Sequence, residues 1–121
     1  MPPKFEKSPP ALVRRFDQLA ELVPEATRRP MFGYPSCVLD GNMFMSLFQD
    51  KLVLRLGADD REALMTKNGG EPFEPMPGRA MKDYVVVPAG MVNTKRVEPW
   101  VARSLEFARS LPAKAMKAAK R

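Results

Sequence analysis

A tight-turn signal near the middle of the chain constrains the fold more than any other feature. Asp40-Gly41 lies between two segments rich in strand-forming residues, and both residue types accept the left-handed backbone angles that a two-residue hairpin turn requires. Gln49-Asp50 provides a second turn signal a short way further along the chain. We therefore predict an antiparallel meander with strands at residues 37–39, 43–48 and 52–56.

Two segments indicate how this sheet is buried and completed. Leu52, Leu54 and Leu56 alternate with Val53 and Arg55, which predicts one buried face and one partly exposed face. The segment 84–87 is a strand by residue type, and it lies in a region punctuated by proline and glycine, residues 71–90. We predict a further hairpin in that region.

Three segments with helical patterns flank the strands. Apolar residues at spacings of three and four predict a helix over residues 11–23, with Ser8 as its N-terminal cap. A short helix is predicted from Asp59, with Glu62 completing a capping box and Gly69 at its end. The last helix is predicted over residues 98–110. This order predicts one α+β domain in two layers, an antiparallel meander sheet with helices on one face.

The charge distribution separates a nearly neutral body from a basic end. The net charge of the 121 residues is +6, but acidic and basic residues almost cancel over residues 8–110. We predict a flexible leader over residues 1–10, a folded domain over residues 11–111 and a disordered basic tail over residues 112–121. The tail is a candidate arm for weak, nonspecific nucleic-acid contact or, equally, a solubilising end without a partner. Its cations are Lys114, Lys117, Lys120 and Arg121.

Absences in the composition limit the function classes. The chain contains no histidine, which excludes histidine metal sites, imidazole acid–base chemistry and Ser-His-Asp or Cys-His catalysis. Cys37 is the only cysteine, and we interpret it as a buried structural thiol, not as a redox sensor or nucleophile. The acids Asp59, Asp60 and Glu62 suit a helix N-terminus without any metal, and we predict no cofactor.

The hydropathy pattern bears on location. No apolar run is long enough to span a bilayer, and the first residues lack the apolar centre of a secretory signal. We therefore predict a cytoplasmic protein without membrane contact.

The motifs between residues 28 and 110 resemble a known family in their order and spacing. Arg28-Arg29-Pro30-Met31-Phe32-Gly33 is similar to the Arg-x-Met-Phe-Gly signature of the TfoX N-terminal domain, found in the TfoX/Sxy competence regulators. The later matches are Asp40-Gly41-Asn42-Met43-Phe44, residues 51–56, Pro72-Phe73, Met76-Pro77-Gly78-Arg79, Tyr84 with Pro88, and Trp100-Val101 with Ser104-Leu105.

The resemblance implies a fold and a class of function. The implied fold is a two-layer α+β domain similar to the YjbR-like and secretion-chaperone-like architectures, and no catalytic residues are implied. The larger family members regulate natural competence in bacteria and are thought to act with a cyclic-AMP receptor protein at promoters. They carry a second, C-terminal domain where this chain ends in its short tail, so we expect a stand-alone N-terminal domain.

On this basis we expect a non-catalytic regulatory or protein-interaction module with an unknown, transcription-related protein partner. Two alternatives stay open. One is a nucleic-acid-binding accessory protein that uses the basic tail and an arginine patch. The other is a homodimeric, chaperone-like module, which rests on fold analogy alone.

Four basic residues are candidates for partner binding: Arg28, Arg29, Arg79 and Lys82. Arginine forks suit phosphate and carboxylate groups, whereas the alternative is a solvated sheet edge where charge deters aggregation, and we favour that edge. The neighbouring Met31-Phe32-Gly33 step is either a partner-docking loop or a strand that enters the core, and we favour the strand.

Overall fold

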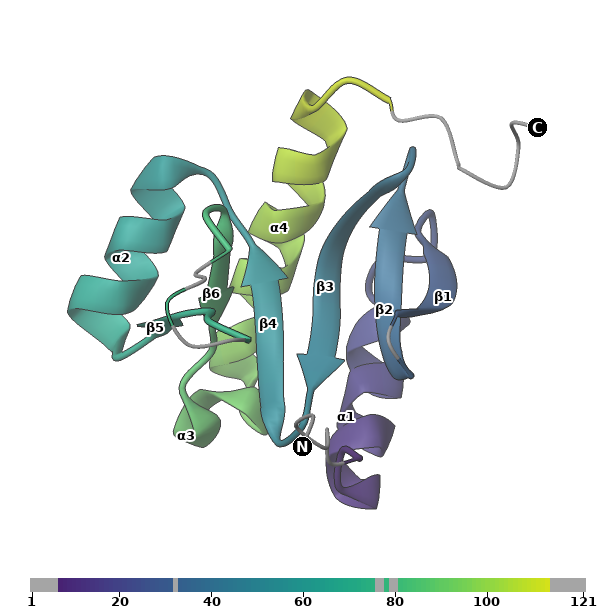
Figure 1. Ribbon diagram of the computed structural model, residues 1–121, viewed down its shortest axis with the longest axis horizontal. Helices are drawn as coiled ribbons and strands as arrows, with labels where there is room; N and C mark the ends of the chain where they lie inside the picture. The colour runs from purple at the N-terminus through teal and green to yellow at the C-terminus, as the bar shows by residue number, and fades with distance from the viewer. Residues whose placement is uncertain (1–6, 32, 76–77, 79–80, 114–121) are drawn as a thin grey trace.

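The computed structural model describes residues 7–31, 33–75, 78 and 81–113, and their elements form an open sheet flanked by helices (Figure 1). The strands are β1 (Thr27–Met31), β2 (Tyr34–Leu39), β3 (Asn42–Phe48), β4 (Lys51–Arg55), β5 (Glu71–Pro72) and β6 (Tyr84–Val86). The helices are α1 (Pro10–Ala20), α2 (Ala58–Asn68), α3 (Ala89–Val92), the 3-10 turn η1 (Lys95–Val97) and α4 (Glu98–Ser110).

The sheet confirms the predicted meander and extends it at both ends. Within the described residues, six strands pair antiparallel in the order β1-β2-β3-β4-β6-β5. Asp40 and Gly41 both have positive φ angles, 51° and 82°, which match the right-handed twist of the hairpin they connect. Gln49 adopts φ 54° in the second predicted turn. The predicted hairpin of residues 71–90 is present as the β5–β6 pair.

The helices cover one face of the sheet, as predicted. In Figure 1, α1 and α4 lie behind the strands, and Leu64 of α2 joins the same core. Leu54 pairs with Met45 on one side and Val85 on the other, so these three side chains lie on the helix-facing side. The fully buried core includes Phe16, Leu19, Phe44, Leu52, Leu54, Leu56 and Val101.

The helix ends differ in part from the predictions. Ser8 does not cap α1, because the helix begins one residue after Pro9 and no side chain caps it. Asp59 lies inside the first turn of α2 and is not its cap, since Gly57 occupies the capping position. Gly69 ends α2 as predicted, with φ 84°. Acidic residues in the first turn interact favourably with the helix dipole whether or not they cap the helix. The sequence alone therefore locates a helix start only to within one or two residues.

Candidate functional site

The predicted basic residues lie in different parts of the sheet. Arg28 and Arg29 are in β1, which is an edge strand, whereas Lys82 lies two residues before β6, and three strands separate β1 from β6. Arg79 and the tail residues Lys114, Lys117, Lys120 and Arg121 lie outside the described residues. The two described arginines are therefore consecutive residues of one strand, with side chains on opposite faces of the sheet, and Lys82 belongs to another region of the sheet.

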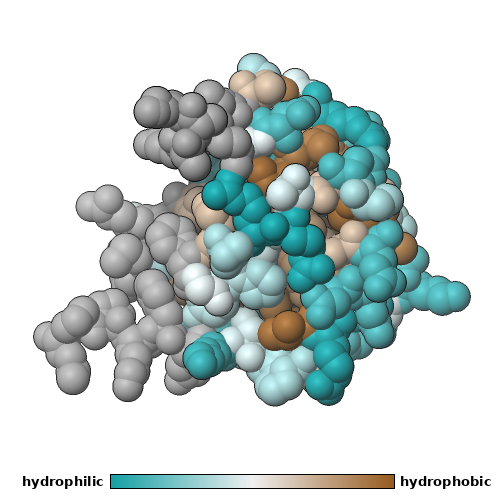
Figure 2. Space-filling view, turned by 90° about the vertical axis from the view of Figure 1, so that its right-hand side faces the viewer, coloured by the Kyte–Doolittle hydropathy of each residue, from teal (hydrophilic) through white to brown (hydrophobic). Residues whose placement is uncertain are grey.

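A cleft with basic lining lies beside β1, between this strand and the start of α1. It has a volume of about 560 Å³, and Lys7, Arg28 and Arg29 supply its cations. Val13, Pro30, Tyr34 and Pro35 supply its apolar walls. Figure 2 shows this side of the molecule, where a band of hydrophilic residues runs across the face with hydrophobic patches between them. We call this the basic cleft.

Arg28 and Arg29 are held differently although they are neighbours. The Arg28 guanidinium lies 2.6 Å from a carboxylate oxygen of Asp17 in α1 and 5.3 Å from the centre of the Phe16 ring. Consecutive strand residues point to opposite faces, so Arg29 leaves the sheet on the side away from the helices. In the sheet, Arg29 lies opposite Ser36 of β2, and the Ser36 hydroxyl donates a hydrogen bond to the backbone carbonyl of Arg29 at 2.6 Å.

The face of the sheet away from the helices carries an apolar cavity of about 440 Å³. Its floor includes Ser46 and Val53, which pair directly across β3 and β4. Its walls are Met31, Tyr34, Met43, Phe48, Phe73 and Met81. The described lining residues come from strands and from the segment between β5 and β6, and none of them is charged. We call this the apolar cavity.

Aromatic rings form a row along this cavity. Tyr34 and Phe48 have ring centroids 5.4 Å apart, and Phe48 and Phe73 have centroids 5.3 Å apart. Tyr84 continues the row at 6.5 Å from Phe73. Tilted and edge-on pairs at these distances are attractive, so the rings stabilise one another and give the cavity a rigid wall.

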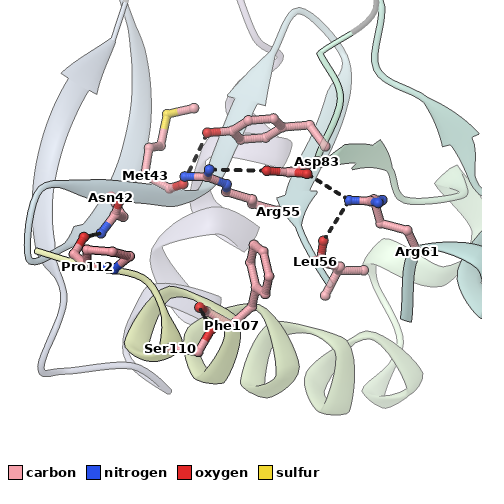
Figure 3. A network of polar contacts seen from close by, with 10 residues as sticks. Asn42, Met43, Arg55, Leu56, Arg61, Asp83, Phe107, Ser110 and Pro112 are labelled. Atoms are coloured by element: carbon pink, nitrogen blue, oxygen red, sulfur yellow. Dashed lines mark hydrogen bonds and ion pairs between the residues drawn. The ribbon is translucent and has the colours of Figure 1, made fainter. Parts of the chain in front are cut away.

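The segment that closes the cavity is anchored by one carboxylate. Asp83 accepts hydrogen bonds from Arg55 at 3.2 Å and from Arg61 at 3.0 Å, as Figure 3 shows. The Asp83 carbonyl accepts from the Leu56 amide, and the Met81 amide donates to the Phe73 carbonyl. The Arg55 guanidinium also lies over the Tyr84 and Phe107 rings. These contacts fix the position of Met81 and Phe73 against the sheet.

The two cavities are neighbours. Tyr34 lines both of them, and Met31 of the apolar cavity is separated from Arg29 of the basic cleft by a single residue of β1. Sequence reasoning found Arg28 and Arg29 but missed Lys7 and the whole apolar cavity. Met31 ends β1 as a strand residue, but it is 36% exposed and does not enter the core as predicted, because β1 is an edge strand. Phe32 of the same step lies outside the described residues.

Cys37 is buried on the helix-facing side of β2, which agrees with its predicted structural role. Burial raises the pKa of the Cys37 thiol to about 11, although the nearby Arg28 charge acts in the opposite direction. The thiol is therefore protonated at physiological pH and is a poor nucleophile.

We expect Cys37 in the native protein to react slowly with a thiol reagent at pH 8. Its pKa of about 11, compared with 9.0 for an exposed thiol, reduces the thiolate fraction roughly a hundredfold, and burial slows access further. In the unfolded state the Cys37 thiol loses its proton at a lower pH than it does in the folded state. The free energy of unfolding should therefore fall as pH rises from 9 towards 11. Labelling by a chromogenic disulfide, with and without urea, measures the first effect. Equal rates in the two conditions would contradict it.

Two negative findings apply to the described part of the chain. It contains no group of three acidic or cysteine side chains placed to hold a metal ion. None of its helices is long and apolar enough to cross a membrane.

Comparison with known proteins identifies the family. The sequence model of the TfoX N-terminal domain matches residues 17–108, which is most of the chain. The chain belongs to the TfoX N-terminal domain family. Searches of curated proteins and of solved structures found no match. The matched residues of this TfoX N-terminal domain include every described residue that lines the apolar cavity, and Arg28 and Arg29 of the basic cleft.

Proposed function

We propose that this TfoX N-terminal domain is a non-catalytic regulatory module that binds a protein partner through the apolar cavity. The observation that supports it is an uncharged cavity on a sheet face to which no described helix contributes a residue. Its volume of about 440 Å³ lies in the range of sites that enclose apolar groups. The family is of the competence-regulator type, which fits a regulatory role.

The cavity has the composition of a partner site. Its methionines are unbranched and adapt to different apolar surfaces, whereas its aromatic rings are rigid. Buried pockets that accept an aromatic or aliphatic anchor contribute most of the affinity in many protein interfaces. Met31 and Met81 are 36% and 37% exposed, so both lie at the mouth of the cavity, where an entering side chain would contact them first.

The lining offers little for catalysis. The Ser46 hydroxyl donates to a backbone carbonyl, Leu47 O at 3.0 Å or Pro35 O at 3.4 Å, and the chain has no histidine to activate it. This supports a binding function for the cavity.

The sheet edges are poor sites for strand addition. Edge strand β1 contains Pro30 and two arginines, and edge strand β5 has only two residues, one of which is Pro72. Proline lacks a backbone donor, and charge deters another strand, so both edges are protected against pairing. A partner is therefore better accommodated on the helix-free face than by extending the sheet.

A pair of charge substitutions tests the proposal. A photo-crosslinking residue at Met81 in the producing cells identifies the partner, and the purified partner is then titrated by calorimetry. We expect the double variant Met31→Glu, Met81→Glu to bind at least tenfold more weakly, because it places charge at the mouth of an apolar cavity.

Leu22→Glu is the matched control. Leu22 is 48% exposed and does not line the cavity, so its substitution should leave the affinity unchanged. Equal binding by all three proteins would contradict the proposal. Light scattering shows whether the crosslinked partner is a second copy of the chain, which would support the homodimer alternative, and crosslinking to nucleic acid alone would support the accessory-protein alternative.

A further inference from the structure

Two methionines at the mouth of the apolar cavity are open to solvent. Met31 and Met81 are both exposed and both line this cavity, although they come from distant parts of the chain. Met45 and Met91, in contrast, are buried in the core. Among the described residues, the methionines most open to solvent are therefore the two at this mouth.

Backbone contacts hold both methionines in place at the mouth. Met31 ends β1 and lies opposite Tyr34 of β2 in the register of the sheet. The Met81 amide donates to the Phe73 carbonyl at 2.8 Å, and the Met81 carbonyl accepts from the Tyr84 amide at 3.1 Å. A chemical change at either sulfur would therefore alter the entrance of the cavity.

We propose that peroxide oxidises Met31 and Met81 to methionine sulfoxide and that this modification keeps apolar groups out of the cavity. This inference rests on the proposed function and gives it a redox control. The thioether sulfur attacks one oxygen of hydrogen peroxide, and the O–O bond breaks as the S–O bond forms. The other oxygen leaves as water with both protons, so the sulfur loses two electrons and the peroxide gains them.

A sulfoxide changes the mouth of the cavity from apolar to polar. The thioether is apolar and flexible, whereas the sulfoxide oxygen is a polar hydrogen-bond acceptor. The described lining contains no cationic or amide side chain that could donate to this oxygen, and the Ser46 hydroxyl donates to a backbone carbonyl. Covering a polar group without a partner costs free energy, so an apolar group would bind the oxidised mouth more weakly.

The single cysteine is a poor competitor for the oxidant. Peroxide reacts with the thiolate form of cysteine, but the Cys37 thiol is buried. Burial also raises the pKa of Cys37 to about 11, so little thiolate is present at neutral pH. A thioether has no proton to lose, and its oxidation depends on access. This difference favours the exposed methionines of the cavity as the oxidised groups.

Site-resolved oxidation of the full chain tests the modification. The native protein is treated with hydrogen peroxide at neutral pH and digested with pepsin, and tandem mass spectrometry quantifies each methionine. We expect Met31 and Met81 to gain one oxygen at least about tenfold faster than Met45 and Met91, because access controls the rate. The same treatment in urea should remove the difference. Equal rates in the native protein would overturn the proposal.

Binding of N-phenyl-1-naphthylamine, an uncharged fluorophore, tests the consequence for the cavity. We expect peroxide treatment to weaken this binding at least about fivefold, because the fluorophore would cover unpartnered sulfoxide oxygens. The two methionine sulfoxide reductases, one for each epimer, should restore the binding with dithiothreitol as the reductant.

Leucine variants show whether these two sulfurs are responsible. Met31→Leu with Met81→Leu keeps most of the apolar volume without sulfur, so this variant should bind the fluorophore normally and lose the response to peroxide. Met65→Leu is the matched control. Met65 lies in α2 and does not line the cavity, so this variant should respond to peroxide as the unchanged chain does.

The outcomes for the two proposals differ. Selective oxidation of Met31 and Met81 without weaker fluorophore binding would overturn the link between oxidation and the cavity, as would an undiminished peroxide response in the double leucine variant. An untreated chain that does not bind the fluorophore would contradict the proposed function, because the cavity would not accept an apolar group. The relative oxidation rates would then still decide whether the two methionines are the modification site.

Discussion

Phe44→Ala should lower the free energy of unfolding by about 3–5 kcal/mol, the cost of removing a large buried ring and leaving a cavity. Phe44 is fully buried at the centre of β3, in the core between the sheet and the helices. A domain of this kind has about 5–15 kcal/mol in total, so this loss is a large fraction. Urea unfolding followed by the fluorescence of Trp100 measures it.

The loss of stability depends on how deeply the substituted side chain is buried. Leu22→Ala removes an apolar side chain that is 48% exposed and should cost well under about 1 kcal/mol. Phe44→Leu keeps most of the buried volume and should lie between these two variants. If Phe44→Ala lost no more stability than Leu22→Ala, the placement of Phe44 in the core would be wrong.

Asp83→Asn should lower the free energy of unfolding by about 2 kcal/mol, because two arginines share this one carboxylate and hydrogen bonds to charged groups contribute about 1.5–3 kcal/mol. The side chains of Arg55 and Arg61 are each only 17% exposed, whereas Asp83 is 30% exposed, so solvent screens part of the interaction. The neutral amide leaves two largely buried guanidinium groups without this counter-charge.

Asp50→Asn is the matched control for charge. Asp50 pairs with Lys51 at 3.2 Å, but its side chain is 74% exposed, so its loss should cost less than about 0.5 kcal/mol. The two variants change the net charge equally and differ only in burial and in the number of partners. Equal stability of both would show that the Arg55–Asp83–Arg61 contacts contribute nothing beyond a surface ion pair.

The Asp83 substitution also has a local consequence. Asp83 positions the segment that carries Met81 and Phe73, and its carbonyl accepts from the Leu56 amide. We expect faster hydrogen exchange at the Leu56 and Met81 amides in Asp83→Asn, measured by NMR, before any change at the centre of the core. Unchanged exchange at both amides would show that the Asp83 ion pairs do not hold this segment in place and so do not determine the shape of the apolar cavity.

Most of the fold followed from local signals in the sequence. Asp40 and Gly41 accept positive φ angles, which sets the register of β2 and β3. The alternation around Leu54 identified the helix-facing side of β4, but the predicted partly exposed face was wrong at Val53, which is only 1% exposed on the other side of the sheet. The last helix was predicted over the range in which α4 forms. Helix starts were less accurate, since Ser8 and Asp59 resemble caps, but neighbouring residues occupy the capping positions.

The candidate site depended on tertiary structure. Sequence composition singled out Arg28 and Arg29, because adjacent arginines on a strand are visible without coordinates. It did not determine that Lys7 would join them while Lys82 lies beyond three other strands, nor that Met31, Phe48 and Met81 would meet around one cavity. Turn and strand preferences act over a few residues, whereas these groupings arise from the strand order and from the Asp83 contacts that place a distant segment on the sheet.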